Sequence, residues 1–326
     1  MNLLELKNIE DMVFDPATIK NGKFIFRDGV KKIRIDVGLS TEGTEGCKWL
    51  LENEDVGVIG IEPNPVCLMQ LYYCTTTNGY LTSLFMKKYK ICQFVGHISE
   101  IFLKKEIMNW DLNVNTPHLI EAIPTDVWTV INNESYHISP TYMFNHTGNF
   151  RMMPILKECK DIRGSYILLK GAIDNVTNSN DIVYQKFYST HGTVNIGASS
   201  LREDVIEDCP KKELTEIFTV PCFSLDKVFG YVDWDKYPFI ECIKIDIEGK
   251  ELDALRSCKK YINKIVFFRV ETFKKDDLLN TTKCDDREII QFMNDNNFEL
   301  FDATPGDYKF VNRALKEMAE ENNLSW

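Results

Sequence analysis

The sequence predicts an α/β protein organised around an open sheet, because apolar segments of strand length alternate with helical patterns. Segment 240–249 shows both features: its first half is apolar and largely β-branched, as in a buried strand. A glycine ends that segment, and Leu252 and Leu255 then recur three residues apart, which indicates a helix. Segments 31–38 and 56–62 are predicted as two further core strands.

The amino-terminal elements are predicted in a strand–helix–strand order. Residues 24–26 can form a short strand, and residues 31–38 form a first core strand that ends at a glycine. The pattern then predicts a polar, glycine-containing loop at 39–46, a helix at 47–52, a second strand at 56–62 and a helix at 66–73. This order is a βαβ unit, the building block of a parallel sheet.

The carboxyl-terminal half continues the alternation of strands and helices. Its predicted elements are strands at 165–174, 182–188 and 218–222, a small-residue loop at 197–201, a helix at 227–229, strands at 240–247 and 264–271, a helix at 286–293, and a closing hairpin at 298–301 and 308–311.

Residues 74–165 do not follow this periodicity. They are rich in aromatic residues, contain four of the five histidines, and are interrupted by prolines. We interpret them as an insertion, or cap subdomain, that covers the site or shapes a substrate pocket; the alternative is that they only extend the core. The length of 326 residues with 44% apolar content suits one large domain with an insertion or two domains. We expect a single domain over residues 1–326.

Composition excludes several classes of function. The formal net charge of −11 argues against a nucleic-acid partner, since phosphate contacts need clustered Lys and Arg.

The ten cysteines are widely spread, as expected for reduced thiols in an intracellular, cytoplasmic protein. The sequence shows neither a signal peptide nor an apolar run of the ~20 residues that span a bilayer, so no membrane association is expected. No histidine pair has helical metal-ligand spacing, so no metal is predicted.

Acidic residues at the ends of predicted strands point to a ligand site. Asp246 and Glu248 end one strand, Glu62 ends another, and Gly38 ends the first. Ligands of open α/β sheets bind at the carboxyl ends of strands, where glycine lets a cofactor approach and an acid can bind ribose hydroxyls. The loop after Gly38 lacks the Gly-x-Gly-x-x-Gly spacing, which favours a nucleoside cofactor without a pyrophosphate. The alternative is a plain sheet with a turn glycine and helix-capping acids.

Taken together, these motifs resemble those of the FkbM-type methyltransferases, which use S-adenosylmethionine. The matching segments occur in the family's order, at residues 35–38, 62–65, 171–174, 197–201, 224–226, 244–249, 270–271 and 306–308. The resemblance implies a Rossmann-like class I methyltransferase fold: a seven-stranded, mostly parallel sheet with a carboxyl-terminal antiparallel hairpin. Two features depart from the family pattern, namely the first loop, Gly-Leu-Ser-Thr-Glu-Gly, and the long 74–165 insertion.

The same resemblance implies roles for individual residues in binding S-adenosylmethionine. Three residues of the first motif and its loop would face the methionine part, and Glu62 would hold the ribose with Asn64 beside it. The adenine would lie against the third strand end. The full set of implied cofactor residues is Asp36, Gly38, Ser40, Glu62, Asn64, Ala172, Ile173 and Asp174.

Methyl transfer to a hydroxyl also requires alignment of the two reacting atoms and a base for the hydroxyl proton. Asp246 is the first candidate base, with orientation of the acceptor or the sulfonium as its rival role, and Glu248 and Glu271 are second choices. His191 could serve from its loop, or be an exposed loop histidine. We therefore predict an O-methyltransferase acting on a hydroxyl of a sugar, glycan or similar small molecule.

Two other functions compete with this prediction. One is a methyltransferase-like binding module whose altered first loop no longer supports catalysis. The other is a nicotinamide oxidoreductase, which the missing pyrophosphate glycines disfavour. The oligomeric state stays open, with a homodimer as one option.

Overall fold

The structure is a computed structural model that describes residues 8–13, 18–39, 45–46, 49–50, 53–64, 165–176, 178, 181–189, 199–206, 216–272, 285–304, 306–322 and 324. Several predicted features lie outside these residues, namely the helix at 66–73, the insertion at 74–165 apart from Ser165, and the site residues Ser40 and His191.

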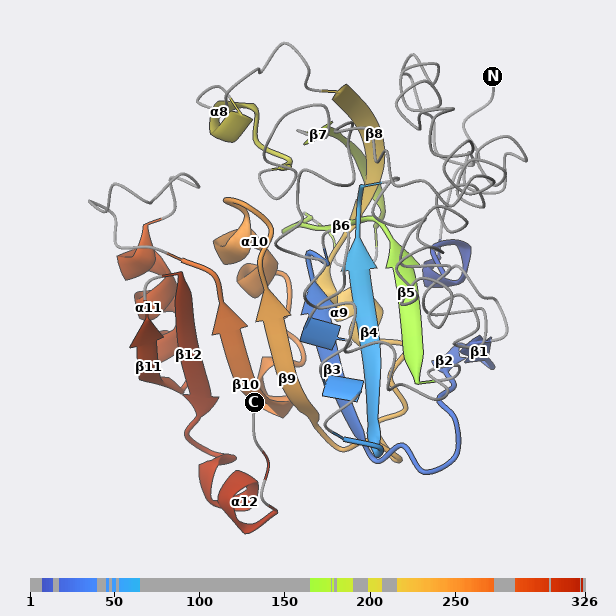
Figure 1. Cartoon of the computed structure of the whole chain (residues 1–326), viewed down its shortest axis with the longest axis vertical. Helices are drawn as coiled ribbons and strands as arrows, with labels where there is room; N and C mark the ends of the chain where they lie inside the picture. The colour runs from blue at the N-terminus through green and yellow to red at the C-terminus, as the bar shows by residue number, and fades with distance from the viewer. Residues whose placement is uncertain are drawn as a thin grey trace, which may run out of the picture.

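The main sheet has seven strands in the order β11-β12-β10-β9-β3-β4-β5 (Figure 1). Their bounds are β3 (Lys32–Val37), β4 (Val56–Glu62), β5 (Tyr166–Lys170), β9 (Ile240–Ile245), β10 (Ile265–Val270), β11 (Phe298–Thr304) and β12 (Asp307–Asn312). The pairs from β10 through β9, β3 and β4 to β5 are parallel, whereas β12 pairs antiparallel with both β10 and β11. This mixed sheet with helices agrees with the predicted α/β class.

The central strands are buried because both faces of the sheet are covered. All seven residues of β4 are buried, and five of six in β3 and in β9. Burial along nearly the whole strand is typical of parallel strands, although β3 includes Arg34 and Asp36 among its buried residues. One ion pair lies within this core: Arg34 Nε donates to Glu241 Oε2 at 2.7 Å, and the Arg34 guanidinium lies 5.4 Å from the Trp49 ring centroid. It joins β3 to β9 through side chains as well as through backbone hydrogen bonds.

A second sheet corrects the prediction of one continuous strand at 165–174. Strand β5 ends at Lys170, and Gly171 has φ +142°, so the chain turns before β6 (Ala172–Ile173). A Cβ on Gly171 would lie 2.5 Å from the Phe223 ring. Strand β6 instead pairs in parallel with β8 (Glu216–Phe223), which pairs antiparallel with β7 (Val183–Ser189). This three-stranded sheet extends beyond the carboxyl ends of β4 and β5 (Figure 1).

Short helices and one small hairpin complete the described fold. These elements are β1 (Ile19–Lys20) and β2 (Lys23–Phe24), which pair with each other, the 3-10 helices η1 (Ile9–Asp11) and η6 (Ile262–Lys264), and the α-helices α8 (Glu203–Ile206), α9 (Leu225–Phe229), α10 (Glu251–Arg256), α11 (Asp286–Asp295) and α12 (Lys316–Glu321). Ser224 caps α9 by accepting from the Lys227 N–H. Within the described part of the chain, no helix is long and apolar enough to cross a membrane.

Candidate functional site

A pocket of about 230 Å³ lies at the carboxyl ends of the strands. Its lining includes most of the residues expected there: Gly38, Glu62, Asn64, Ala172, Ile173, Asp246, Glu248 and Glu271. Asp36 and Asp174 do not line the pocket but lie behind its wall, with exposed fractions of 1% and 7%. The fold thus brings strand ends that are distant in sequence to one cavity, where sheet geometry predicts a ligand.

Glu62 is held in a fixed orientation at the end of β4. Its Oε1 accepts from the Asn64 N–H at 2.7 Å and its Oε2 from the Leu39 N–H at 3.0 Å. Only 4% of the residue is exposed. A carboxylate oxygen can accept more than one hydrogen bond, and Glu62 lines the pocket. An acid fixed in this way is suited to accept hydrogen bonds from two neighbouring hydroxyls, as a ribose presents them.

Gly38 allows two loops of the site to touch. Its φ is +84°, and a Cβ built on it would lie 1.7 Å from the Asp246 carbonyl oxygen. The adjoining backbone is paired on both sides, since Gly38 N–H donates to the Ile61 carbonyl and Asp246 N–H to the Val37 carbonyl. Any larger residue would push the end of β3 away from Asp246.

Lys244 connects the acids of two strands. Its Nζ lies 2.9 Å from Asp246 Oδ2 and 3.6 Å from Asp36 Oδ1, and it donates to the Gly38 carbonyl at 3.2 Å. Burial opposes its charge, but Asp246 and Asp36 outweigh burial and raise the Lys244 pKa, so the ammonium persists. Burial raises the pKa of Asp36, which Lys244 and the N–H of Gly46 partly offset. Sequence reasoning missed Lys244; the available signal was a lysine in an apolar strand, two residues before Asp246.

Asp246, Glu248 and Glu271 form a cluster, since each offers a carboxylate oxygen within 4.8 Å of the others. Burial would raise the pKa of Asp246, but Lys244 and a hydrogen bond from Glu271 hold it below its usual range. Burial and the hydrogen bond to Asp246 raise the pKa of Glu271 far above its usual range. Burial, then Asp246, raises the pKa of Glu248 to about 9. At neutral pH Asp246 is therefore ionised, whereas Glu248 and Glu271 hold protons.

The same three carboxylates are of the ligand type that Mg²⁺ or Ca²⁺ uses. The spacing of the histidines gave no hint of such a group, because it comes from the ends of β9 and β10. Lys244, 2.9 Å from Asp246, already supplies a positive charge at this position.

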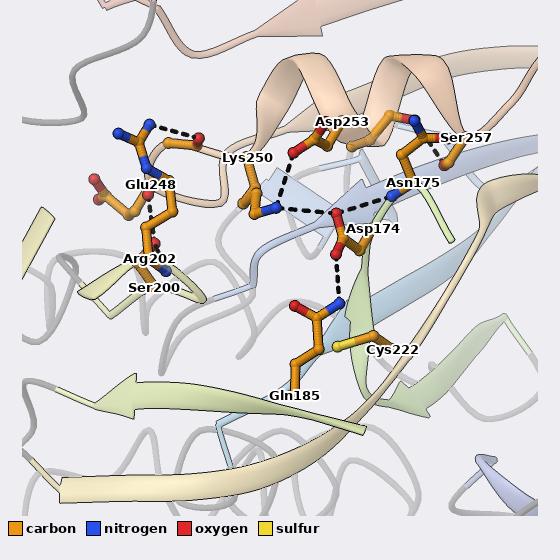
Figure 2. A network of polar contacts seen from close by, with 12 residues as sticks. Asp174, Asn175, Gln185, Ser200, Arg202, Cys222, Glu248, Lys250, Asp253 and Ser257 are labelled. Carbon is orange, nitrogen blue, oxygen red and sulfur yellow. Dashed lines mark hydrogen bonds and ion pairs between the residues drawn. The ribbon is translucent and has the colours of Figure 1, made fainter. Parts of the chain in front are cut away.

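Glu248 stands on a tight turn that the surrounding chain fixes. Its φ is +56° and that of Gly249 is +102°. The buried Glu251 side chain accepts from the N–H groups of Ile247 and Gly249, so this acid, and not Asp246 or Glu248, stabilises the start of α10. From the other side, Ser200 Oγ donates to the Glu248 carbonyl at 2.7 Å (Figure 2).

Arg202 completes that support. Its Nη1 donates to the Gly249 carbonyl at 3.1 Å, while its guanidinium also pairs with Asp204 at 2.6 Å. A non-glycine residue at positive φ costs about 1–3 kcal/mol, which the surrounding hydrogen bonds must offset. The loop at 199–202 therefore determines where the Glu248 side chain enters the pocket.

At the opposite end of the pocket, Lys250 and Asp174 form a bridge (Figure 2). Lys250 Nζ lies 3.3 Å from Asp174 Oδ1 and 2.8 Å from Asp253 Oδ2. Asp174 also accepts from the Asn175 N–H and from the Gln185 side chain on β7. Lys250 lines the pocket, so it is the charged group that a ligand meets there.

Sequence reasoning also missed the apolar residues that β7 and the 199–202 segment add to the pocket, Phe187 and Leu201. The pattern at 182–188 predicts a strand but not its position, because a small second sheet carries it to the site.

Comparison with known families gave one result. The model of the methyltransferase FkbM domain matches residues 44–300, which is most of the chain. Separate comparisons with curated proteins and with solved structures found no match.

Proposed function

Because the chain belongs to the FkbM methyltransferase domain family, we propose that it is an S-adenosylmethionine-dependent O-methyltransferase that modifies a hydroxyl of a sugar, glycan or similar small molecule. The strand order, with β12 antiparallel between β10 and β11, supports assignment to the Rossmann-like class I methyltransferases. The proposal places the enzyme in the cytoplasm.

The orientation of Glu62 is the observation that carries the cofactor assignment. Two backbone N–H groups fix its carboxylate at the wall of a pocket that also contains Asp246. A nucleoside whose ribose binds Glu62 can extend toward Ile173 on one side and toward Asp246 on the other. The second direction accommodates a positively charged group, because Asp246 is ionised there and the neighbouring Glu248 can release its proton when a cation lies beside it. A sulfonium satisfies that requirement.

The cofactor, when bound, supplies an electrophilic methyl group; the residues of the chain orient the acceptor and manage its proton. Lys244 keeps Asp246 ionised, so Asp246 can accept a hydrogen bond from the acceptor hydroxyl. Its low pKa makes it a weak base for removing that proton. Glu248 is more basic than Asp246, with a pKa of about 9. A positive charge beside Glu248 lowers that pKa, and thereby produces a carboxylate only when the cofactor is present.

The same charge states support a second candidate, a methyltransferase-like binding module. None of the carboxyl groups of Asp246, Glu248 and Glu271 combines an ionised state with a pKa near neutrality. If cofactor binding does not lower the pKa of Glu248, the pocket holds a ligand without an effective base. A measurement of methyl transfer therefore distinguishes an enzyme from a module that only binds the ligand.

Titration calorimetry with S-adenosylmethionine and S-adenosylhomocysteine tests the cofactor assignment. Binding of both supports it, and absence of heat at millimolar ligand refutes it. Transfer of a labelled methyl group to a panel of sugars and polyols then separates the two candidates. Turnover on any member supports the enzyme, whereas tight binding without turnover on the whole panel supports the module.

A further inference from the structure

We propose that Lys250 recognises the nucleobase of the cofactor by donating a hydrogen bond from its ammonium to a ring nitrogen of adenine. This inference rests on the proposed function, since it assigns a role within the same pocket. It makes Asp174 a positioning residue that acts through Lys250.

The first step is the location of Lys250. The pocket extends from Asp246 and Glu271, at the ends of β9 and β10, to the residues beside β5 and β6. Glu62 lies between, on β4. A nucleoside held at Glu62 with its charged end toward the carboxylates therefore directs its base toward Ile173 and Lys250.

The second step is the environment at that end. Ala172 and Ile173, next to Asp174, supply apolar surface at that end, and Phe187 and Leu201 add apolar surface elsewhere in the lining of the same pocket; such surface suits the faces of a flat aromatic ring. Their side chains offer no hydrogen bond to a ring nitrogen. Lys250 supplies a charged donor beside this apolar surface, and only 21% of its side chain is exposed.

The third step is that the ammonium is held in place before a ligand binds. Asp174 and Asp253 accept from Lys250 Nζ on two sides (Figure 2). An ammonium has three N–H groups, so these two partners leave one for a ligand. Gln185 and the Asn175 N–H fix Asp174 in turn. Such pre-organisation reduces the entropy that a flexible lysine loses on binding.

The fourth step is the match in chemistry. Each adenine ring nitrogen outside the glycosidic bond is a neutral acceptor and carries no hydrogen. An ammonium can donate a hydrogen bond to such an atom while both groups keep their ordinary protonation states. If Lys250 only stabilised the start of α10, its ion pair with Asp253, three residues later, would be sufficient. That role does not account for its second ion pair, with Asp174, which comes from a distant segment of the chain.

Calorimetry with S-adenosylhomocysteine and its 1-deaza, 3-deaza and 7-deaza analogues tests the inference. In each analogue a CH replaces one ring nitrogen. We expect at least one analogue to bind the wild type about 10–100-fold more weakly than the parent, as for loss of a hydrogen bond to a charged group. Lys250→Met should weaken the parent by a similar factor and abolish the penalty for that analogue. Lys259→Met, which changes an exposed lysine outside the pocket lining, should alter neither value.

Three outcomes would overturn the inference. If Lys250→Met binds S-adenosylhomocysteine as tightly as the wild type, Lys250 does not contact the ligand. If the substitution weakens binding of all four ligands by the same factor, the role of Lys250 is structural alone. If the wild type binds all three analogues as tightly as the parent, no donor of the protein bonds to a ring nitrogen of adenine. This result needs only the wild type, so it holds even if the variant does not fold. Failure of the wild type to bind S-adenosylhomocysteine at all is a separate result, because it refutes the proposed function itself.

Discussion

Replacing Glu248 with Gln should stabilise the protein without its cofactor, by an amount that grows with pH. Burial and the neighbouring Asp246 raise the Glu248 pKa from 4.5 to about 9. Between these values the folded chain binds a proton that the unfolded chain releases, so this group's contribution to stability falls as pH rises. Gln removes the titration, and it keeps the size and the backbone position of Glu248 at φ +56°.

The magnitude follows from the two pKa values. Each pKa unit corresponds to about 1.4 kcal/mol, so the interval from 4.5 to pH 7 gives a gain of about 3 kcal/mol. The same relation gives about 1 kcal/mol at pH 5.5 and about 5 kcal/mol at pH 8. Below pH 4.5 the gain disappears, because both states of the wild type are then protonated.

Urea unfolding of the wild type and Glu248→Gln at pH 5.5, 7 and 8 measures this difference. Glu320→Gln serves as the control, because Glu320 is exposed on α12. A difference that does not change with pH, or a less stable Glu248→Gln at pH 8, would show that Glu248 is ionised in the protein measured without cofactor. The proposed generation of a base on cofactor binding would then have no support.

Four further changes test the remaining residues of the site. Glu62→Ala should weaken S-adenosylhomocysteine binding by about 1–3 kcal/mol, the cost of an unmade buried hydrogen bond; unchanged affinity in calorimetry would remove Glu62 from the cofactor site. Gly38→Ala should destabilise the fold, because its Cβ would lie 1.7 Å from the Asp246 carbonyl oxygen, and a melting temperature equal to wild type would contradict that contact. Lys244→Met should cost about 3–5 kcal/mol of unfolding free energy, since it leaves Asp36 and Asp246 without their cation; urea unfolding at pH 7 with no loss would place the charge balance elsewhere. Asp246→Asn should leave the circular dichroism spectrum intact and slow methyl transfer, whereas full turnover would exclude a direct role in the reaction.

The strands could be predicted from sequence because their pattern is local. Strands β4 and β10 are nearly continuous apolar runs, whereas β3 and β9 intersperse β-branched apolar residues with charged ones; both patterns are visible within a short segment. The hairpin of β11 and β12 also follows from alternation and a turn. The break after β5 could not be predicted in this way. It depends on the Phe223 ring and the Pro221 carbonyl packing against Gly171, and those residues come some fifty positions later.

The site residues also differ in whether a local sequence signal marks them. Glu62 and Asp246 could be predicted because each ends a recognisable strand, and the fold alone brings them to one pocket. Lys244 has a local signal, because its nearer partner Asp246 follows two residues later. Its contact with Asp36 on β3, and the contact of Lys250 with Asp174 after β6, could not be predicted because they join distant segments.

The two lysines also explain how so many acids can share one cavity. Unpaired carboxylates in a buried site would hold protons, as Glu248 and Glu271 do. Lys244 keeps the nearby Asp246 ionised, and Lys250 pairs with Asp174 at the other end, so each end carries a defined charge. A ligand with a cation near Asp246 and a neutral acceptor near Lys250 is complementary to both ends. Glu62 lies between them, and this sequence of charge, hydroxyl and base is the one that a sulfonium nucleoside presents.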